Sequence, residues 1–144
     1  MHRLLTLVAK LPLSFLQFFG AFVGELVFWL APGYRRRTRA NLCAAGYTHK
    51  SIFARVGRNA GRQAMESIWV WYRPTETVLE HVRVDEKAEK LIGDAMRSGR
   101  PIVFMTPHVG CFEVLPVWLA GTLYKETGRR ITILYRPPRK KILR

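Results

Sequence analysis

The chain begins with a long apolar stretch in which less apolar positions recur at regular intervals. The stretch from Leu11 to Leu30 contains 20 residues, and a helix of that length, rising about 1.5 Å per residue, can cross a hydrocarbon core of about 30 Å. The less apolar positions share one narrow helical stripe opposite the phenylalanines; they are Lys10, Ser14, Gln17, Ala21 and Glu25. We expect this stripe to face protein and the helix to cross the membrane, with a shallow position at the membrane surface as the alternative.

The remainder of the chain alternates helical and strand-like patterns. Apolar positions at helical spacing predict a helix over residues 51–72, and Asp85 is a suitable N-cap for a second helix. The short apolar runs Ile102–Met105 and Ile131–Tyr135 are typical of buried parallel strands, and a helix is expected between them from Glu113 to Tyr124. The sequence therefore predicts an α/β fold, in which an N-terminal membrane helix precedes a β-α-β core with a right-handed crossover.

Charge and cysteine content restrict the partners and the compartment. The net charge of +14 favours an anionic partner, such as phospholipid headgroups, a phosphorylated glycolipid, an acidic carrier protein or nucleic acid. Four arginines follow the apolar stretch, at positions 35, 36, 37 and 39, which places the rest of the chain on the cytoplasmic side by the positive-inside rule. Cys43 and Cys111 are too few for a disulfide framework or a zinc site, and we expect both to be reduced.

Small residues in the apolar stretch suggest close helix packing. Gly20 and Gly24 form a G-x3-G pair, which can let another backbone approach a membrane helix. We expect this pair to contact the rest of the same chain, with dimerisation as the alternative.

One histidine and one carboxylate lie just past the first predicted strand. His108 and Glu113 are five residues apart, which on an unbroken helix separates them by about 140°. Gly110 lies between them and can take a positive φ, so the chain can bend and bring the two side chains together. Glu113 would then fix the tautomer of His108, which would act as a general base. The alternative is a structural histidine, with Glu113 stabilising a helix start.

Several stretches resemble a known family. Thr106-Pro-His-Val-Gly-Cys-Phe-Glu113 resembles the H-x4-D/E block of the lysophospholipid acyltransferase superfamily, and its glutamate form is similar to the late acyltransferases of lipid A biosynthesis. The basic segment Arg35–Leu42 resembles the R-x5-N-L stretch that follows the membrane anchor in those enzymes, and Leu134–Pro137 resembles the end of their second strand. The family continues for a comparable length beyond these motifs, so the chain resembles an amino-terminal portion, expected to be inactive by itself.

The resemblance implies the activity and the division of the chain. Residues 1–30 would form the membrane anchor and residues 31–144 the amino-terminal part of an acyltransferase α/β/α domain at the cell inner membrane, anchored as a single-pass or monotopic protein. An acyl carrier protein, or another acyl thioester donor, would supply a fatty acyl group to a hydroxyl of a lipid A precursor. Apart from the resemblance, Arg136 follows the second predicted strand, where a guanidinium could hold a phosphate or a carboxylate, with an ordinary surface charge as the alternative. Arg136 and Gly110 are assigned to substrate binding. Direct transfer needs no acyl-enzyme, so Cys111 is expected to be structural, and neither a metal nor an organic cofactor is implied.

Two other functions are kept open. A glycerophospholipid acyltransferase would use the same dyad on a phospholipid acceptor. A non-catalytic, basic, membrane-tethered fragment would hold His108 and Glu113 for structure alone. Nucleic-acid binding is disfavoured because the arginines lack regularly interleaved aromatic residues.

Overall fold

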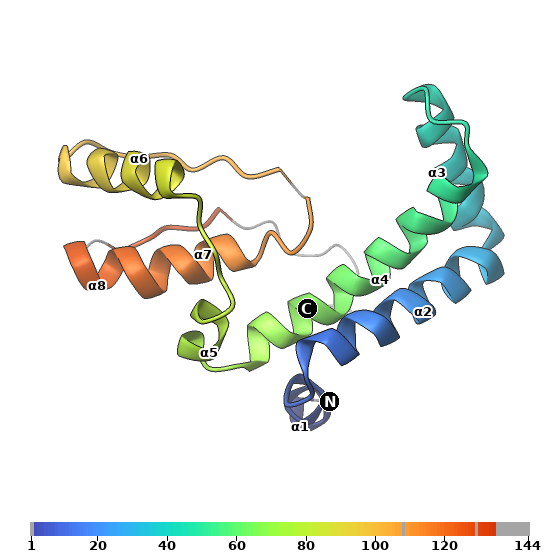
Figure 1. The fold of residues 1–144 in the computed structure, drawn as a ribbon, viewed down its shortest axis with the longest axis horizontal. Coiled ribbons are helices and arrows are strands. Elements are labelled where there is room, and N and C mark those ends of the chain that lie inside the picture. The colour runs from blue at the N-terminus through green and yellow to red at the C-terminus, as the bar shows by residue number, and fades with distance from the viewer. Residues whose placement is uncertain (1, 108, 129, 135–144) are drawn as a thin grey trace.

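A computed structural model describes residues 2–107, 109–128 and 130–134 of the chain, and the ordered elements of these residues are helices (Figure 1). Their bounds in chain order are α1 (His2–Ala9), α2 (Leu13–Leu30), α3 (Pro32–Ala44), α4 (Lys50–Tyr72), α5 (Thr75–Leu79), α6 (Glu86–Arg97), α7 (Val114–Trp118), η1 (Leu119–Leu123) and α8 (Tyr124–Thr127). Helices α2 and α4 lie side by side, and α5 connects α4 to the part of the molecule that contains α6 and α7.

The packing of α2 against α4 depends on glycines. A Cβ built at Gly20 would lie 2.5 Å from the carbonyl oxygen of Gly61, and a Cβ at Gly24 would overlap the carbonyl oxygen of Gly57. The two G-x3-G pairs therefore face each other, and the absence of side chains lets the backbones touch. This confirms that Gly20 and Gly24 contact the same chain.

Two apolar clusters form the core and join the helices. The first centres on Leu16, Trp69, Val70 and Val78, which come from α2, α4 and α5. The second centres on Trp118 and Leu119, against which α6 packs Ile92 and Met96. Val82 contacts both clusters. The core is therefore continuous from the α2–α4 pair to the helices around the expected site.

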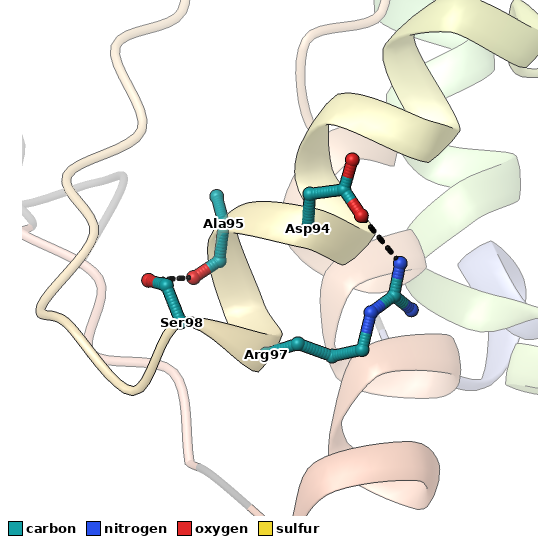
Figure 2. Close-up of polar contacts among 4 residues, drawn as sticks. All are labelled: Asp94, Ala95, Arg97 and Ser98. Atoms are coloured by element: carbon teal, nitrogen blue, oxygen red, sulfur yellow. Dashed lines mark hydrogen bonds and ion pairs between the residues drawn. The ribbon is translucent and has the colours of Figure 1, made fainter.

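Helix α6 begins where the sequence predicts. Asp85 Oδ1 accepts hydrogen bonds from the backbone N–H groups of Lys87 at 3.0 Å and Ala88 at 3.3 Å, which satisfies two otherwise unpaired donors at the helix start. At the other end, Arg97 pairs with Asp94 at 2.7 Å and the Ser98 hydroxyl donates to the Ala95 carbonyl (Figure 2).

The helix expected between Glu113 and Tyr124 is present and changes its winding in the middle. The segments α7, η1 and α8 follow one another without a break from Val114 to Thr127, and η1 is a π-helical turn. The Thr122 hydroxyl donates to the Trp118 carbonyl within this turn. A π-turn adds one residue to a helical turn and shifts the side chains that follow it.

The predicted β-α-β core is wrong, because the described residues contain no strand. The run 102–105 lies outside any helix or strand and is not buried: Val103 is 85% exposed and Met105 92% exposed. In the second run, Leu134 is 98% exposed, and Tyr135 lies outside the described residues. A buried parallel strand needs neighbouring strands for its backbone groups and helices over both faces, and no neighbouring strand is described here. An apolar run alone therefore does not specify a strand.

Candidate active site around Glu113

Gly110 bends the chain just before α7. It adopts a φ of +61°, in the left-handed region that glycine occupies without strain. The bend is closed by backbone hydrogen bonds, from Phe112 N–H to Gly110 O at 3.0 Å and from Val114 N–H to Cys111 O at 3.2 Å. The predicted bend is confirmed, and it places Glu113 at the first position before α7.

The carboxylate of Glu113 is held by two side chains from different parts of the chain. The Ser67 hydroxyl on α4 lies 2.9 Å from Glu113 Oε1 and donates to it, and the Cys111 thiol donates to Oε2 with an Sγ–O distance of 3.7 Å. Both contacts are partly buried. Because each oxygen has its own donor, the plane of the carboxylate is fixed.

The Ser67 hydroxyl lies within hydrogen-bond distance of two acceptors. Its Oγ lies 2.9 Å from the Gln63 carbonyl in the same helix as well as 2.9 Å from Glu113 Oε1. A hydroxyl carries one hydrogen, so it donates to one acceptor at a time. An ionised carboxylate is the stronger acceptor of the two, which favours the bond to Glu113.

A second carboxylate, that of Glu66, belongs to α4 and is next to Ser67 in the sequence. Glu66 accepts a hydrogen bond from the Gln17 side-chain amide of α2 at 2.7 Å. Gln17 is one of the polar positions of the apolar stretch, so this part of the predicted stripe does face protein. The contact connects α2 to the turn of α4 that also carries Ser67.

Cys111 is a neutral thiol in this environment. Burial, together with the nearby negative charges of Glu113 and Glu66, raises the pKa of the Cys111 thiol to about 12. The thiolate is the nucleophilic form of cysteine. Cys111 is therefore unsuited to attack a thioester, and its visible role is to donate a hydrogen bond to Glu113.

Two of the predicted site residues, His108 and Arg136, lie outside the described residues. Glu113 and Gly110 are described, and their surroundings add Ser67, which the sequence analysis did not identify. Ser67 and Glu113 are 46 positions apart, and no spacing rule connects them. The one signal in the sequence is a small polar residue among the apolar positions of the predicted helix 51–72.

Other features of the described residues lie away from Glu113. A pocket between α6 and the α7–η1 helix is lined by Glu86, Glu89, Lys90, Gly93, Arg97, Trp118 and Thr122, none of which is a predicted site residue. No group of three or more His, Cys, Asp or Glu side chains that could hold a metal ion occurs in the described part of the chain.

Basic side chains of α3 pack on aromatic rings. Arg35 donates to the Trp29 carbonyl at 2.5 Å and its guanidinium lies 5.8 Å from the centre of the Trp29 ring. Arg39 lies 5.3 Å from the centre of the Phe53 ring. The arginines that follow α2 are thus held near aromatic surface.

Comparisons with known proteins identify the family. No curated protein and no solved structure matches the chain. A family model described as bacterial lipid A biosynthesis acyltransferase matches residues 2–143, almost the whole chain. The resemblance found in the sequence motifs is thereby confirmed, and the chain belongs to the bacterial lipid A biosynthesis acyltransferase family.

Proposed function

We propose that the protein transfers a fatty acyl group from an acyl carrier protein thioester to a hydroxyl of a lipid A precursor. The family supports an acyltransferase in general; the donor, the acceptor and the residues are the proposal. His108 takes the proton of the acceptor hydroxyl, and the oxygen attacks the thioester carbonyl carbon. The C–S bond then breaks, and the leaving thiolate takes the proton back from the imidazolium.

The observation that carries the proposal is the fixed carboxylate of Glu113. A residue that only stabilises a helix start needs no partner beyond the helix N–H groups. Glu113 makes no side-chain hydrogen bond to the start of α7, and instead its two oxygens accept from Ser67 and Cys111. A carboxylate oriented in this way, directly after a bend that follows His108, suits the task of aligning an imidazole.

Gly110 and Arg136 remain assigned to substrate binding. A glycine in a tight bend lets substrate approach the backbone closely, and an arginine can hold a phosphate or a carboxylate through two hydrogen bonds. The basic charge of the chain suits both a phosphorylated acceptor and an acidic carrier protein. The proposal also divides the chain into two parts. Residues 1–30 form the membrane anchor, and residues 31–144 form part of the catalytic domain at the cytoplasmic side of the inner membrane.

The test compares variants of a chain extended to the length of the family, with acyl carrier protein thioester as donor. His108→Ala is expected to remove nearly all turnover while donor binding is kept, and Glu113→Ala to lower it by about 10²–10⁴-fold, the usual effect of lost acid–base assistance. Cys111→Ser, the matched control inside the site, is expected to leave turnover nearly unchanged. A His108→Ala variant with wild-type turnover would refute the mechanism.

The acceptor distinguishes the alternatives. Transfer to a lysophospholipid in place of a lipid A precursor would assign the glycerophospholipid reaction. Membrane binding without turnover on either acceptor, even in the extended chain, would assign a non-catalytic tether.

A further inference from the structure

Because α2 and α4 pack antiparallel, the two helices would lie at the same depth if α2 crossed a membrane. Contacts run along the length of α2, and their partners on α4 descend in step: Gln17 with Glu66, Gly20 with Gly61, Gly24 with Gly57, and Glu25 with Arg58 at 3.6 Å. The middle of α2 is therefore level with the middle of α4. A bilayer that α2 crossed would therefore also border α4.

Helix α4 is too polar to share a hydrocarbon core. Arg58 and Glu66 are paired with Glu25 and Gln17 of α2, but Arg55 and Arg62 on the same helix are exposed. If α2 crossed the bilayer, Arg62 would lie next to its centre, where an arginine on an exposed helix face is strongly disfavoured. The packed pair is therefore incompatible with a crossing position, although α2 alone is long and apolar enough to span.

The face of α2 that points away from α4 is apolar and large. It consists of Phe15, Phe18, Phe19, Phe22, Leu26, Trp29 and Leu30, which are between 46% and 75% exposed. At about 100° per residue, these positions fall within an arc of about 120°. A continuous band of this kind along one helix marks a contact surface.

The end of this apolar band carries groups that favour an interface between lipid and water. Trp29 belongs to the band, and Arg35 both donates to its carbonyl and lies over its ring. Tryptophan prefers the level of the lipid headgroups, and arginine can reach their phosphates. The positive charge continues along α3 in Arg36, Arg37 and Arg39.

We propose that the α2–α4 pair lies in the plane of the membrane surface, with the Phe15–Leu30 band inserted into one leaflet and α4 on the aqueous side. The occupant of the band is an acidic phospholipid bilayer, because Arg35 beside Trp29 and the further arginines of α3 complement anionic headgroups. The chain is then monotopic, and both ends of α2 lie on the same side of the membrane. The inference is independent of the catalytic proposal, since it needs no turnover.

Topology labelling of the 144-residue chain tests the proposal directly. Single cysteines are placed before and after α2, as Lys10→Cys and Gly33→Cys, in a background with Cys43→Ser and Cys111→Ser; a Cβ at position 33 meets no atom within 4 Å. A membrane-impermeant maleimide is added to sealed vesicles of each orientation, and labelling after detergent treatment gives the total for each variant. We expect both positions to be labelled from the same side. Labelling from opposite sides would establish a spanning helix and overturn the proposal.

Vesicle binding tests the surface and its occupant. The purified chain is titrated with vesicles of phosphatidylglycerol and phosphatidylcholine, and with phosphatidylcholine alone. We expect Phe18→Ser and Phe22→Ser each to weaken binding to the acidic vesicles about tenfold, since each removes a large apolar group from the lipid. Leu91→Ser is the matched control, because Leu91 on α6 is 71% exposed, as Phe18 is at 75%, and it should bind like the wild type.

Either of two results would overturn the assignment of this face. One is wild-type binding by both phenylalanine variants. The other is equal binding to neutral and acidic vesicles, which would remove the role of the arginines. Circular dichroism of each variant confirms that its helices are intact.

Discussion

Ser67 donates a hydrogen bond to the Glu113 carboxylate, which belongs to another part of the chain. Its hydroxyl lies on α4, and the Glu113 carboxylate that it contacts precedes α7. If Glu113 orients His108, then the geometry of the proposed base depends on a helix that carries no reacting group. Ser67 is thus a positioning residue in the proposed mechanism.

Removing the Ser67 hydroxyl should slow transfer without weakening substrate binding. A hydrogen bond to a charged group contributes about 1.5–3 kcal/mol, so Ser67→Ala is expected to lower kcat roughly 10–100-fold in the extended chain, with KM little changed. Ser67→Thr keeps a hydroxyl and should restore most of the rate. Ser51→Ala, at the other end of α4, is the control. Equal rates for the alanine and threonine variants would show that the hydroxyl has no part in catalysis.

The two cysteines should differ in reactivity. A rise of the Cys111 pKa from 9.0 to about 12 leaves roughly a thousandfold less thiolate at pH 8 than an ordinary thiol has, and the deficit disappears only as the pH approaches 12. Cys43 is exposed. Iodoacetamide at pH 8, followed by mass spectrometry, is expected to modify Cys43 well before Cys111, and to modify both at similar rates in urea. Fast modification of Cys111 in the folded chain would contradict its neutral state.

At the scale of elements, the α2–α4 contact leaves the least room for an added side chain among the described glycines. A Cβ at Gly61 would overlap the carbonyl oxygen of Gly20, and neither backbone can move without separating the helices. Alanine normally improves a helix by about 1 kcal/mol over glycine, so a loss of stability at this position would come from packing alone.

Gly61→Ala is therefore expected to lower the free energy of unfolding by about 1–3 kcal/mol, the usual cost of overpacking. The measurement is urea unfolding followed by circular dichroism at 222 nm. Gly33→Ala, where a Cβ has open space, is the control and should be neutral or slightly stabilising. If both variants behaved alike, the close approach of the two helices would be wrong.

The sequence predicted helices better than strands, for a physical reason. The signals for α6 are local: Asp85 caps its own helix, and Gly99, with a φ of +74°, follows its end. The bend at Gly110 is local too. A strand depends on partners elsewhere, so the apolar run 102–105 could not reveal that Val103 and Met105 would be exposed. Apolar character alone does not decide which side of α6 faces the core either: Leu91 is 71% exposed, whereas its neighbour Ile92 packs against the second cluster.

The site residues, too, could be predicted only where their signals are local. Glu113 and the bend before it followed from the order of residues along a few turns. Ser67 did not, because its contact with Glu113 depends on how α4 packs against the segment before α7. Tertiary contacts of this kind leave no periodic signal in one sequence.

At the scale of the whole molecule, two exposed apolar segments favour self-association. Val103, Met105 and Leu134 present apolar side chains on backbone outside the helices, without a neighbouring strand among the described residues. Such backbone can pair with another copy of the chain.

The 144-residue chain is accordingly expected to self-associate and to show no acyl transfer, whereas a chain extended to the family's length should remain dispersed and turn over. Size-exclusion chromatography with light scattering measures the association, and Met105→Lys should reduce it by adding a charge to the exposed segment. Leu91→Lys, at an exposed helical position, should have little effect. Turnover by the 144-residue chain alone would contradict the expectation.

Helix α2 is synthesised before α4, so it has to wait for its packing partner during translation. Ribosomes add about 5–20 residues per second, so the roughly 40 residues between Leu30 and Tyr72 take about 2–8 s to appear. Throughout that interval α2 exists as a lone apolar helix, with nothing covering Gly20 and Gly24. If the membrane-surface position proposed above is correct, insertion of α2 across the bilayer competes with the arrival of the glycine face of α4. Slower translation of residues 31–72 would favour the crossing outcome, so codon usage in this short region can influence where the protein resides.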